Sequence, residues 1–294
     1  MKVHSIGLRT DLALHLRDGL VEEHPDPVGH LVLRTPDNPD FYGGNALVIP
    51  SLSSASDLER WERRFAEAFP AANHRSFCVD CRADSPYRSP APARSAAGLR
   101  QGELPLVNSP HADALELARA RGYAVRRLAV LTARPSTLRK LALPPGLTLR
   151  PFEDADWASQ LELSRAIDAA SGLVGEAHER YLAGYLASRR RWSKMGTGSW
   201  WGLWDGPTLC SSAGLFWQDG VGRYQDVMTA PAARRRGLAS ALISQVGLRA
   251  LRADCHTLVI VSVDESDAYR LYLSLGFEVR EHFHDLLRTP DPAG

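Results

Sequence analysis

The first half of the chain alternates short apolar runs with a segment of helical periodicity. Within residues 57–69, Leu58, Trp61, Phe65 and Phe69 recur at steps of three and four, which predicts an amphipathic helix. Runs rich in β-branched and aromatic residues, separated by turn formers, predict strands. The expected order is strand 30–35, strand 45–49, helix 57–69, strand 74–81, helix 111–121 and strand 123–132.

The second half shows the same kind of pattern with more elements. Prolines and glycine at 135 and 144–146 mark a linker between the halves, which predicts a domain boundary near residue 140. The expected order after the linker is strand 147–152, helices 154–169 and 178–195, strands 199–204, 208–217 and 223–229, helix 235–252, strand 257–263, helix 266–275 and strand 277–287.

The two halves repeat each other in the order strand, strand, helix, strand, helix, strand. Gly122 and Gly276 lie 154 positions apart, and the residues around them match at the same offset. An internal duplication explains this agreement. Chance similarity between two α/β patterns is the alternative. The other pairs at this offset are Asp113 with Asp267, Ala114 with Ala268, Leu117 with Leu271, and Tyr123 with Phe277.

Composition narrows the class of protein. The 294 residues are 44% hydrophobic and 23% charged, with a net charge of +1, which gives no broad basic field for nucleic acid. No apolar run approaches the roughly 20 residues that span a bilayer, and the start does not resemble a secretory signal. We therefore expect a cytoplasmic protein with no nucleic-acid or membrane partner. The Ala- and Arg-rich composition suggests a bacterial source.

The four cysteines do not predict a disulfide scaffold. Cys78 and Cys81 form a CxxC pair, but no second ligand pair follows at the spacing that zinc sites use. On a strand, that spacing of three places the two side chains on opposite faces. We therefore expect no metal.

The segment from Asp226 to Ser240 carries the chemistry. A predicted strand ends near Thr229, Pro231 turns the chain out of the sheet, and a helix follows Gly237. The first turn of a helix has N–H groups without internal partners and a partial positive charge. Gly237 and small Ala239 let an anion approach these amides, and the arginines add charge suited to phosphate. The pattern predicts a diphosphate site, although a loop with a solvated arginine patch is the alternative.

At these positions the sequence resembles the GNAT superfamily, the acetyl-CoA-dependent N-acetyltransferases. Arg234, Gly237 and Ala239 match the family's Arg/Gln-x-x-Gly-x-Gly/Ala motif, and a second motif matches Ala-x-x-Leu/Phe-Tyr-x-x-x-Gly-Phe. Glu265 stands where many members have Asn. The resemblance covers residues 147–288. The second motif is carried by Ala268, Leu271, Tyr272, Gly276 and Phe277.

The resemblance implies an α+β (mixed α/β) fold of two tandem GNAT-like domains, each a mostly antiparallel mixed sheet flanked by helices. Residues 1–140 would form a degenerate GNAT-like domain and residues 141–294 the catalytic acetyltransferase domain. Acetyl-CoA would be the acyl donor, without a metal. The residues implied in its binding are Val227, Met228, Thr229, Arg234, Arg235, Arg236, Gly237, Leu238, Ala239 and Ser240.

The same resemblance implies direct attack of an amine on the thioester. A strand amide near Val227 to Thr229 would stabilise the oxyanion, and Tyr272 would protonate the departing thiolate. Asp226 is the nearest acidic candidate for the base, but strand alternation places it opposite Val227. Glu176 and Asp168 are further candidates. The acceptor would be a small-molecule or protein amine, and the oligomeric state is not indicated.

Several aromatic residues could form a substrate wall or simply a core, and the core is favoured because sheets select aromatics for packing. They are Trp200, Trp201, Trp204, Phe216 and Trp217.

The first half keeps the pattern and loses the motifs. Residues 51–57 contain no glycine or arginine, their Ser and Asp side chains can cap the following helix, and Ala118 stands where the second half has Tyr272. Residues 34–45 are dense in turn formers and aromatics and could contribute to a cleft between the domains.

A non-catalytic acyl-CoA-binding regulatory module is the alternative function. A nucleotide-binding protein is disfavoured because the sequence lacks Gly-Lys-Ser/Thr.

Overall fold

The computed structural model describes residues 1–24, 29–80 and 110–290. The segment 82–110, whose richness in Pro, Ser and Ala predicts a loop, falls almost entirely outside these ranges, as does Cys81. The α-helices of the described residues are α1 (Ile6–Arg17), α2 (Ala55–Ala68), α3 (Pro110–Ala120), α4 (Asp156–Ala169), α5 (Glu176–Lys194), α6 (Leu238–Ala250) and α7 (Asp267–Ser274). The strands are β1 (Val21–His24), β2 (His30–Leu33), β3 (Ala46–Ile49), β4 (Arg75–Val79), β5 (Ala124–Ala133), β6 (Leu147–Pro151), β7 (Gly198–Asp205), β8 (Thr208–Gln218), β9 (Val221–Thr229), β10 (Thr257–Val263) and β11 (Glu278–Arg288).

All these strands join one mixed sheet, in the order β1-β2-β3-β4-β11-β5-β10-β9-β8-β7-β6. The order is symmetric about its centre: β4 and β10, β3 and β9, and β2 and β8 stand at equal distances from the β11–β5 pair. The order strand, strand, helix, strand, helix, strand is met by β2-β3-α2-β4-α3-β5 in the first half and by β8-β9-α6-β10-α7-β11 in the second, so the predicted repeat is present in the topology. Two parallel pairs, β3–β4 and β9–β10, occupy equivalent places, and the other pairs are antiparallel.

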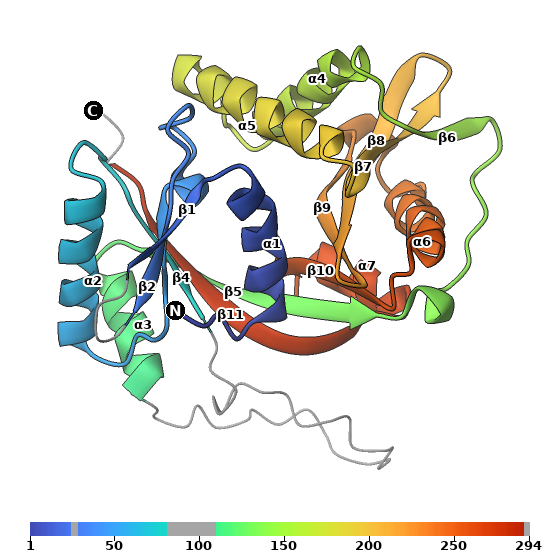
Figure 1. Ribbon diagram of the computed structural model, residues 1–294. Helices are drawn as coiled ribbons and strands as arrows, with labels where there is room; N and C mark the ends of the chain where they lie inside the picture. The colour runs from blue at the N-terminus through green and yellow to red at the C-terminus, as the bar shows by residue number, and fades with distance from the viewer. Residues whose placement is uncertain (25–28, 81–109, 291–294) are drawn as a thin grey trace.

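The last strand of each half lies in the other half's part of the sheet. β5, from the first half, pairs with β10, and β11, from the second half, pairs with β4. β5 and β11 also pair with each other, with Glu278 opposite Thr132 and Leu287 opposite Ala124. In Figure 1 these two long strands run across the bottom of the molecule and connect its two sides. The halves therefore share a continuous backbone ladder.

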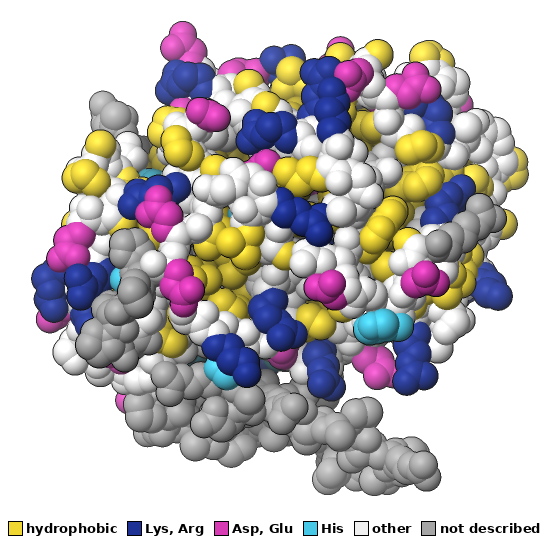
Figure 2. Space-filling view, in the orientation of Figure 1, with side chains coloured by type: hydrophobic (Ala, Val, Ile, Leu, Met, Phe, Trp, Pro, Cys, Tyr) yellow, Lys and Arg dark blue, Asp and Glu magenta, His cyan; other side chains and the backbone are white. Residues whose placement is uncertain are grey.

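Helices cover both faces of the sheet. One core packs α2 and α3 against the strands of the first half, and another packs α6 and α7 against those of the second. On the opposite face, α1, α4 and α5 meet around Trp157, Trp192, Trp200 and Phe216. Both signs of charge are scattered over the face shown in Figure 2. None of the helices in the described ranges has the length and apolar character that crossing a bilayer requires.

Helix α1 was not expected from the sequence, and it lies between the two halves (Figure 1). Ser5 caps its first turn by accepting from the Leu8 N–H, and the Asp80 carboxylate at the end of β4 accepts from the Ser5 N–H at 2.9 Å. Gly7 allows close packing on the sheet, because an added Cβ would lie 2.6 Å from Val130 Cγ2. The helix therefore closes the concave side of the shared sheet.

Candidate active site

Strand β9 contains a bulge at the position where the sequence analysis placed the reacting groups. Ser212 of β8 faces Met228, but Gly214 faces Gln225, so one residue of β8 opposes both Asp226 and Val227. Asp226 has a φ of 46°, in the left-handed region. The extra residue breaks the strict alternation of side chains on which the sequence argument relied.

Beyond its first residues, β9 separates from its parallel neighbour. The pairing with β10 joins Val221 to Thr257 and ends at Arg223 with Val259. Residues 224–229 continue as a strand on the β8 side, so their other edge is not part of the β9–β10 ladder. The GNAT resemblance implies that this strand splays from its neighbour, and the observed opening agrees with that splay. It leaves backbone groups of β9 available for an extended ligand.

The turn after β9 presents an open helix start. Pro231–Ala233 form a 3-10 turn, and Gly237 has a φ of 73° directly before α6. The N-cap residue Gly237 has no side chain to cap α6, and a Cβ added there would meet no atom of the described residues within 4 Å. The helix begins at Leu238, three residues later than expected, because the left-handed Gly237 cannot belong to it. The amides of its first turn therefore face open space, as an anion site requires.

These features converge on one pocket of about 500 Å³. Nine of the ten residues predicted to bind the acyl donor line it, together with Asp267, Ala268 and Leu271 at the start of α7 and Ile167 of α4. Arg236 is exposed and lies outside the lining. The nine are Val227, Met228, Thr229, Arg234, Arg235, Gly237, Leu238, Ala239 and Ser240.

Tyr272 lies next to this pocket in sequence but is not part of its lining. Its side chain is buried, and its ring contacts Phe277 with centroids 6.2 Å apart. Burial raises the pKa of Tyr272 to about 12, although nearby Arg223 acts in the opposite direction. The hydroxyl is therefore protonated throughout the physiological range.

Asp226 is held in a network of donors. Tyr185 donates to Asp226 Oδ2 at 2.7 Å, and the Arg189 Nε donates to the same oxygen at 3.2 Å. The Arg189 side chain is only 4% exposed, and its guanidinium lies 3.7 Å from the centre of the Tyr185 ring. Burial alone would lower the pKa of Arg189, but the Tyr185 and Asp226 oxygens raise it above its ordinary value. The structure therefore places Asp226 in a partly buried ion pair rather than in the pocket lining.

The other two acidic candidates for the base lie outside the pocket. Asp168 Oδ2 lies 3.0 Å from the His178 Nε2, and Glu176 opens α5. Neither lines the pocket.

Residues from the first half also lie against the Asp226 network. The sequence indicated segment 34–45 as a contributor but did not indicate α1. Phe41, in the turn-rich segment 34–45, packs edge-on against Tyr185 with centroids 5.0 Å apart. Asn38 donates to the Tyr181 carbonyl at 2.9 Å. From α1, Asp11 accepts from the Gln225 amide at 2.8 Å. Burial acts to raise the pKa of Asp11, but His15 and Arg223 hold it below its ordinary value.

The equivalent position in the first half is closed. β3 is paired with β4 up to its last residue, Ile49, so no splay follows. Ser54 caps α2 by accepting from the Asp57 N–H at 3.1 Å, and Ala118 is fully buried. The self-capping expected from the sequence is confirmed.

The aromatic residues divide between core and surface. Trp200, Trp204 and Phe216 are buried, as the core interpretation expected, while Phe216 and Trp217 also line a second pocket. Cys78 is a free thiol whose pKa is raised by burial. No cluster of three or more potential metal ligands occurs within the described ranges.

Comparison with known families agrees with this geometry. The family described as acetyltransferase (GNAT) domain matches residues 196–279, from just before β7 to the start of β11. Residues 196–279 form a GNAT acetyltransferase domain. The GNAT domain thus contains β9, the Gly237 turn and Tyr272. No curated protein sequence matches the chain.

Three solved structures resemble this chain over nearly its whole length, including the GNAT domain. A conserved, functionally unknown protein from Staphylococcus epidermidis has a TM-score of 0.64 at 13% identity, covering 92% of this chain and 95% of its own. A GCN5-related N-acetyltransferase from Kribbella flavida has a TM-score of 0.54 at 16% identity, covering 99% and 98%. A tandem GNAT protein from the clavulanic acid biosynthesis pathway has a TM-score of 0.52 at 13% identity, covering 97% and 88%. At these identities the likeness shows the fold, which is that of GNAT proteins, including a tandem one.

Proposed function

We propose that this protein transfers an acetyl group from acetyl-CoA to a primary amine by direct attack, and that residues 141–294 contain the working site. A GNAT domain supports acyl-CoA-dependent acetyl transfer as a class of reaction. The observation that carries the proposal is the uncapped start of α6, with Gly237 open to the pocket where β9 and β10 separate. Residues 1–140 act as the silent half.

Different residues of the pocket would bind different parts of acetyl-CoA. The amides that open α6 and the exposed Arg234 and Arg235 would hold the diphosphate. The free edge of β9 at residues 227–229 would pair with the amide groups of the pantetheine arm and donate to the oxyanion. Acetyl-CoA, when bound, supplies an activated thioester.

Proton transfer completes the proposal. The acceptor amine must attack as a neutral group. Asp226, within the bulge, is the acidic candidate for the base, and because it pairs with Arg189 and does not line the pocket it would act through water. The Tyr272 hydroxyl, protonated at neutral pH, would donate to the departing thiolate. The acceptor is an amine of a small molecule or of a protein.

Binding of acetyl-CoA by isothermal calorimetry tests the donor site. Gly237→Glu places a carboxylate where the diphosphate would lie, so we expect its affinity for acetyl-CoA to fall at least about 100-fold. Gly206→Glu is a matched control: Gly206 also has a positive φ and open space, in the β7–β8 turn. Equal affinity in native and Gly237→Glu protein would rule out the donor site.

The alternative is a regulatory module that binds acyl-CoA without turnover. It is favoured by one observation, namely that Tyr272 and Asp226 do not line the pocket. A screen of small amines and peptides that monitors release of free thiol separates the two functions. Tight binding of acetyl-CoA with no thiol release across the panel would favour the module.

A further inference from the structure

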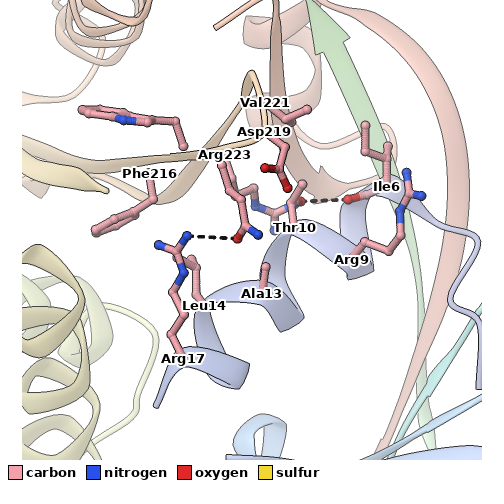
Figure 3. A pocket seen from close by; sticks show the side chains of 12 residues that line it. Ile6, Arg9, Thr10, Ala13, Leu14, Arg17, Phe216, Asp219, Val221 and Arg223 are labelled. Atoms are coloured by element: carbon pink, nitrogen blue, oxygen red, sulfur yellow. Dashed lines mark hydrogen bonds between the residues drawn. The ribbon is translucent and has the colours of Figure 1, made fainter. Parts of the chain in front are cut away.

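A second pocket, of about 350 Å³, lies between α1 and the β8–β9 hairpin. It shares no residue with the pocket at Gly237. One wall comes from the first half, through α1, and the other from the second half, through Phe216 to Arg223. Figure 3 shows Arg9 and Arg17 projecting from the two ends of this stretch of α1, with Arg223 and Asp219 on the strand side between them. Its volume is in the range of small-molecule sites.

Cationic side chains outnumber anionic ones in this lining. Arg9, Arg17 and Arg223 face one carboxylate, that of Asp219. Arg17 donates to Gln218 Oε1 at 3.1 Å and to the Thr197 hydroxyl, both neutral acceptors. Within the described residues, neither Arg9 nor Arg17 forms an ion pair. Two guanidinium groups at the surface of the pocket therefore lack a matching anion within the part of the chain that the structure describes.

Arg223 is the deepest charge of the three. Its side chain is 11% exposed, and its Nη1 donates to the Gly7 carbonyl at 3.2 Å. The nearest carboxylate, of Asp11, is 3.9 Å from Nη2, and the buried Nε has no hydrogen-bond partner among the described residues. Burial lowers the pKa of Arg223 despite Asp11 and Asp226. The Arg223 guanidinium therefore has no carboxylate closer than 3.9 Å among the described residues, and its exposed part lines the pocket, where an anion could meet it.

We propose that this pocket binds the anionic group of a small molecule, a carboxylate or a phosphate, through Arg17 and Arg223, with Arg9 at the rim. Guanidinium groups suit both anions because they donate in a planar fork. Ile6, Ala13, Leu14 and Phe216 give the remaining wall an apolar surface for the carbon skeleton. The Asp219 carboxylate would repel a bound anion, so removing its charge should raise the affinity that removing an arginine lowers. The site does not depend on acetyl transfer.

Calorimetric titration with inorganic phosphate and with succinate, each at fixed ionic strength, tests the site and distinguishes the two anions. Succinamide, which has the shape of succinate without its charge, is expected not to bind. Arg17→Gln should weaken binding of the preferred anion about tenfold, the effect of one lost charge-assisted hydrogen bond. Arg119→Gln, an exposed arginine on α3, is the control and should change nothing.

Asp219→Asn gives the opposite expectation. Asp219 has a φ of 51°, which asparagine also adopts, so this change removes the charge without new backbone strain. We expect anion affinity to rise severalfold. Gly237→Glu should leave this binding intact, because the α6 cradle is a separate phosphate site.

Three results would overturn the site. These are absence of binding by both anions, equal affinity in native, Arg17→Gln and Asp219→Asn proteins, and loss of all anion binding in Gly237→Glu. Failure of acetyl-CoA to bind would count against the proposed function alone.

Discussion

Tyr272 shows that a residue can occupy its place in a motif while its side chain packs as core. Its ring lies against Phe277, and from the same helix Ala268 and Leu271 reach the pocket. The raised pKa of about 12 suits a group that must remain protonated until a thiolate needs its proton. In the proposed mechanism, Tyr272 would therefore enter the reaction with its proton in place.

Tyr272→Phe keeps the ring and removes only that hydroxyl. We expect kcat to fall about 100-fold with the affinity for acetyl-CoA unchanged, because the lost group acts only on the leaving thiolate. Steady-state thiol release and calorimetry measure the two quantities. Because its pKa is about 12, Tyr272 should cause no loss of kcat between pH 7 and 9. Native kcat in the Phe variant would assign the proton donor elsewhere.

At this scale the sequence predicted residues that line the pocket at Gly237 and missed the network around Asp226. Gly237, Ala239 and their neighbours act through local backbone geometry, which a contiguous motif encodes. The partners of Asp226, by contrast, come from α5, about 40 positions away in the chain. A bulge also shifts the register there, and alternation along a strand cannot reveal a bulge.

Among the elements, the contact between segment 34–45 and α5 ties the first half to the Asp226 network. Gly184 permits it, because an added Cβ would lie 2.8 Å from Asn38 Cγ. Nearby, Arg180 pairs with Asp40 at 3.1 Å, and Phe41 covers Tyr185. The segment thus supports the helix that carries Tyr185 and Arg189.

Gly184→Ala tests this contact, because the substitution should change the free energy of unfolding in opposite directions with and without the Asn38 side chain. Alanine favours a helix interior over glycine by about 1 kcal/mol, but the clash with Asn38 should give a net loss of about 1–3 kcal/mol in the free energy of unfolding. In an Asn38→Gly background the clash disappears, and the same substitution should stabilise the protein. Urea denaturation measures both. An effect of the same sign in the two backgrounds would show that the contact does not decide stability.

Most elements after residue 29 were predictable, because each carries one apolar face or a continuous buried run. α1 was missed for a physical reason. Its buried residues Gly7, Leu8, Leu12, Leu14 and His15 lie on one broad face, which the sheet covers on one side and α5 on the other. That face includes a glycine and a histidine, with Asp11 between them, so its apolar residues alone do not show a clear helical period.

For the whole molecule, the repeat predicted two similar halves, and the structure shows them sharing one sheet through β5 and β11. Local sequence could not indicate this sharing, because the alternative pairing of each strand within its own half uses the same residues. The boundary near residue 140 remains a proposal about evolutionary units.

Separate expression of residues 1–140 and 141–294 tests the sharing. Each fragment alone would leave the inner edge of β4 or β10 unpaired, so we expect aggregation or loss of cooperative unfolding. Together the fragments should form a one-to-one complex, because β5 and β11 can then pair as in the intact chain. Affinity capture on one tagged fragment followed by size-exclusion chromatography measures this. A soluble, cooperatively unfolding 141–294 monomer would contradict the expectation.

The position of α1 also has a consequence for biosynthesis. This helix is made before the strands it packs on, and its surroundings include Val259 and Phe283, which are made more than 240 residues later. Its apolar residues must therefore remain without these native neighbours while those residues are translated, which makes this segment a natural client for chaperones that shield hydrophobic segments.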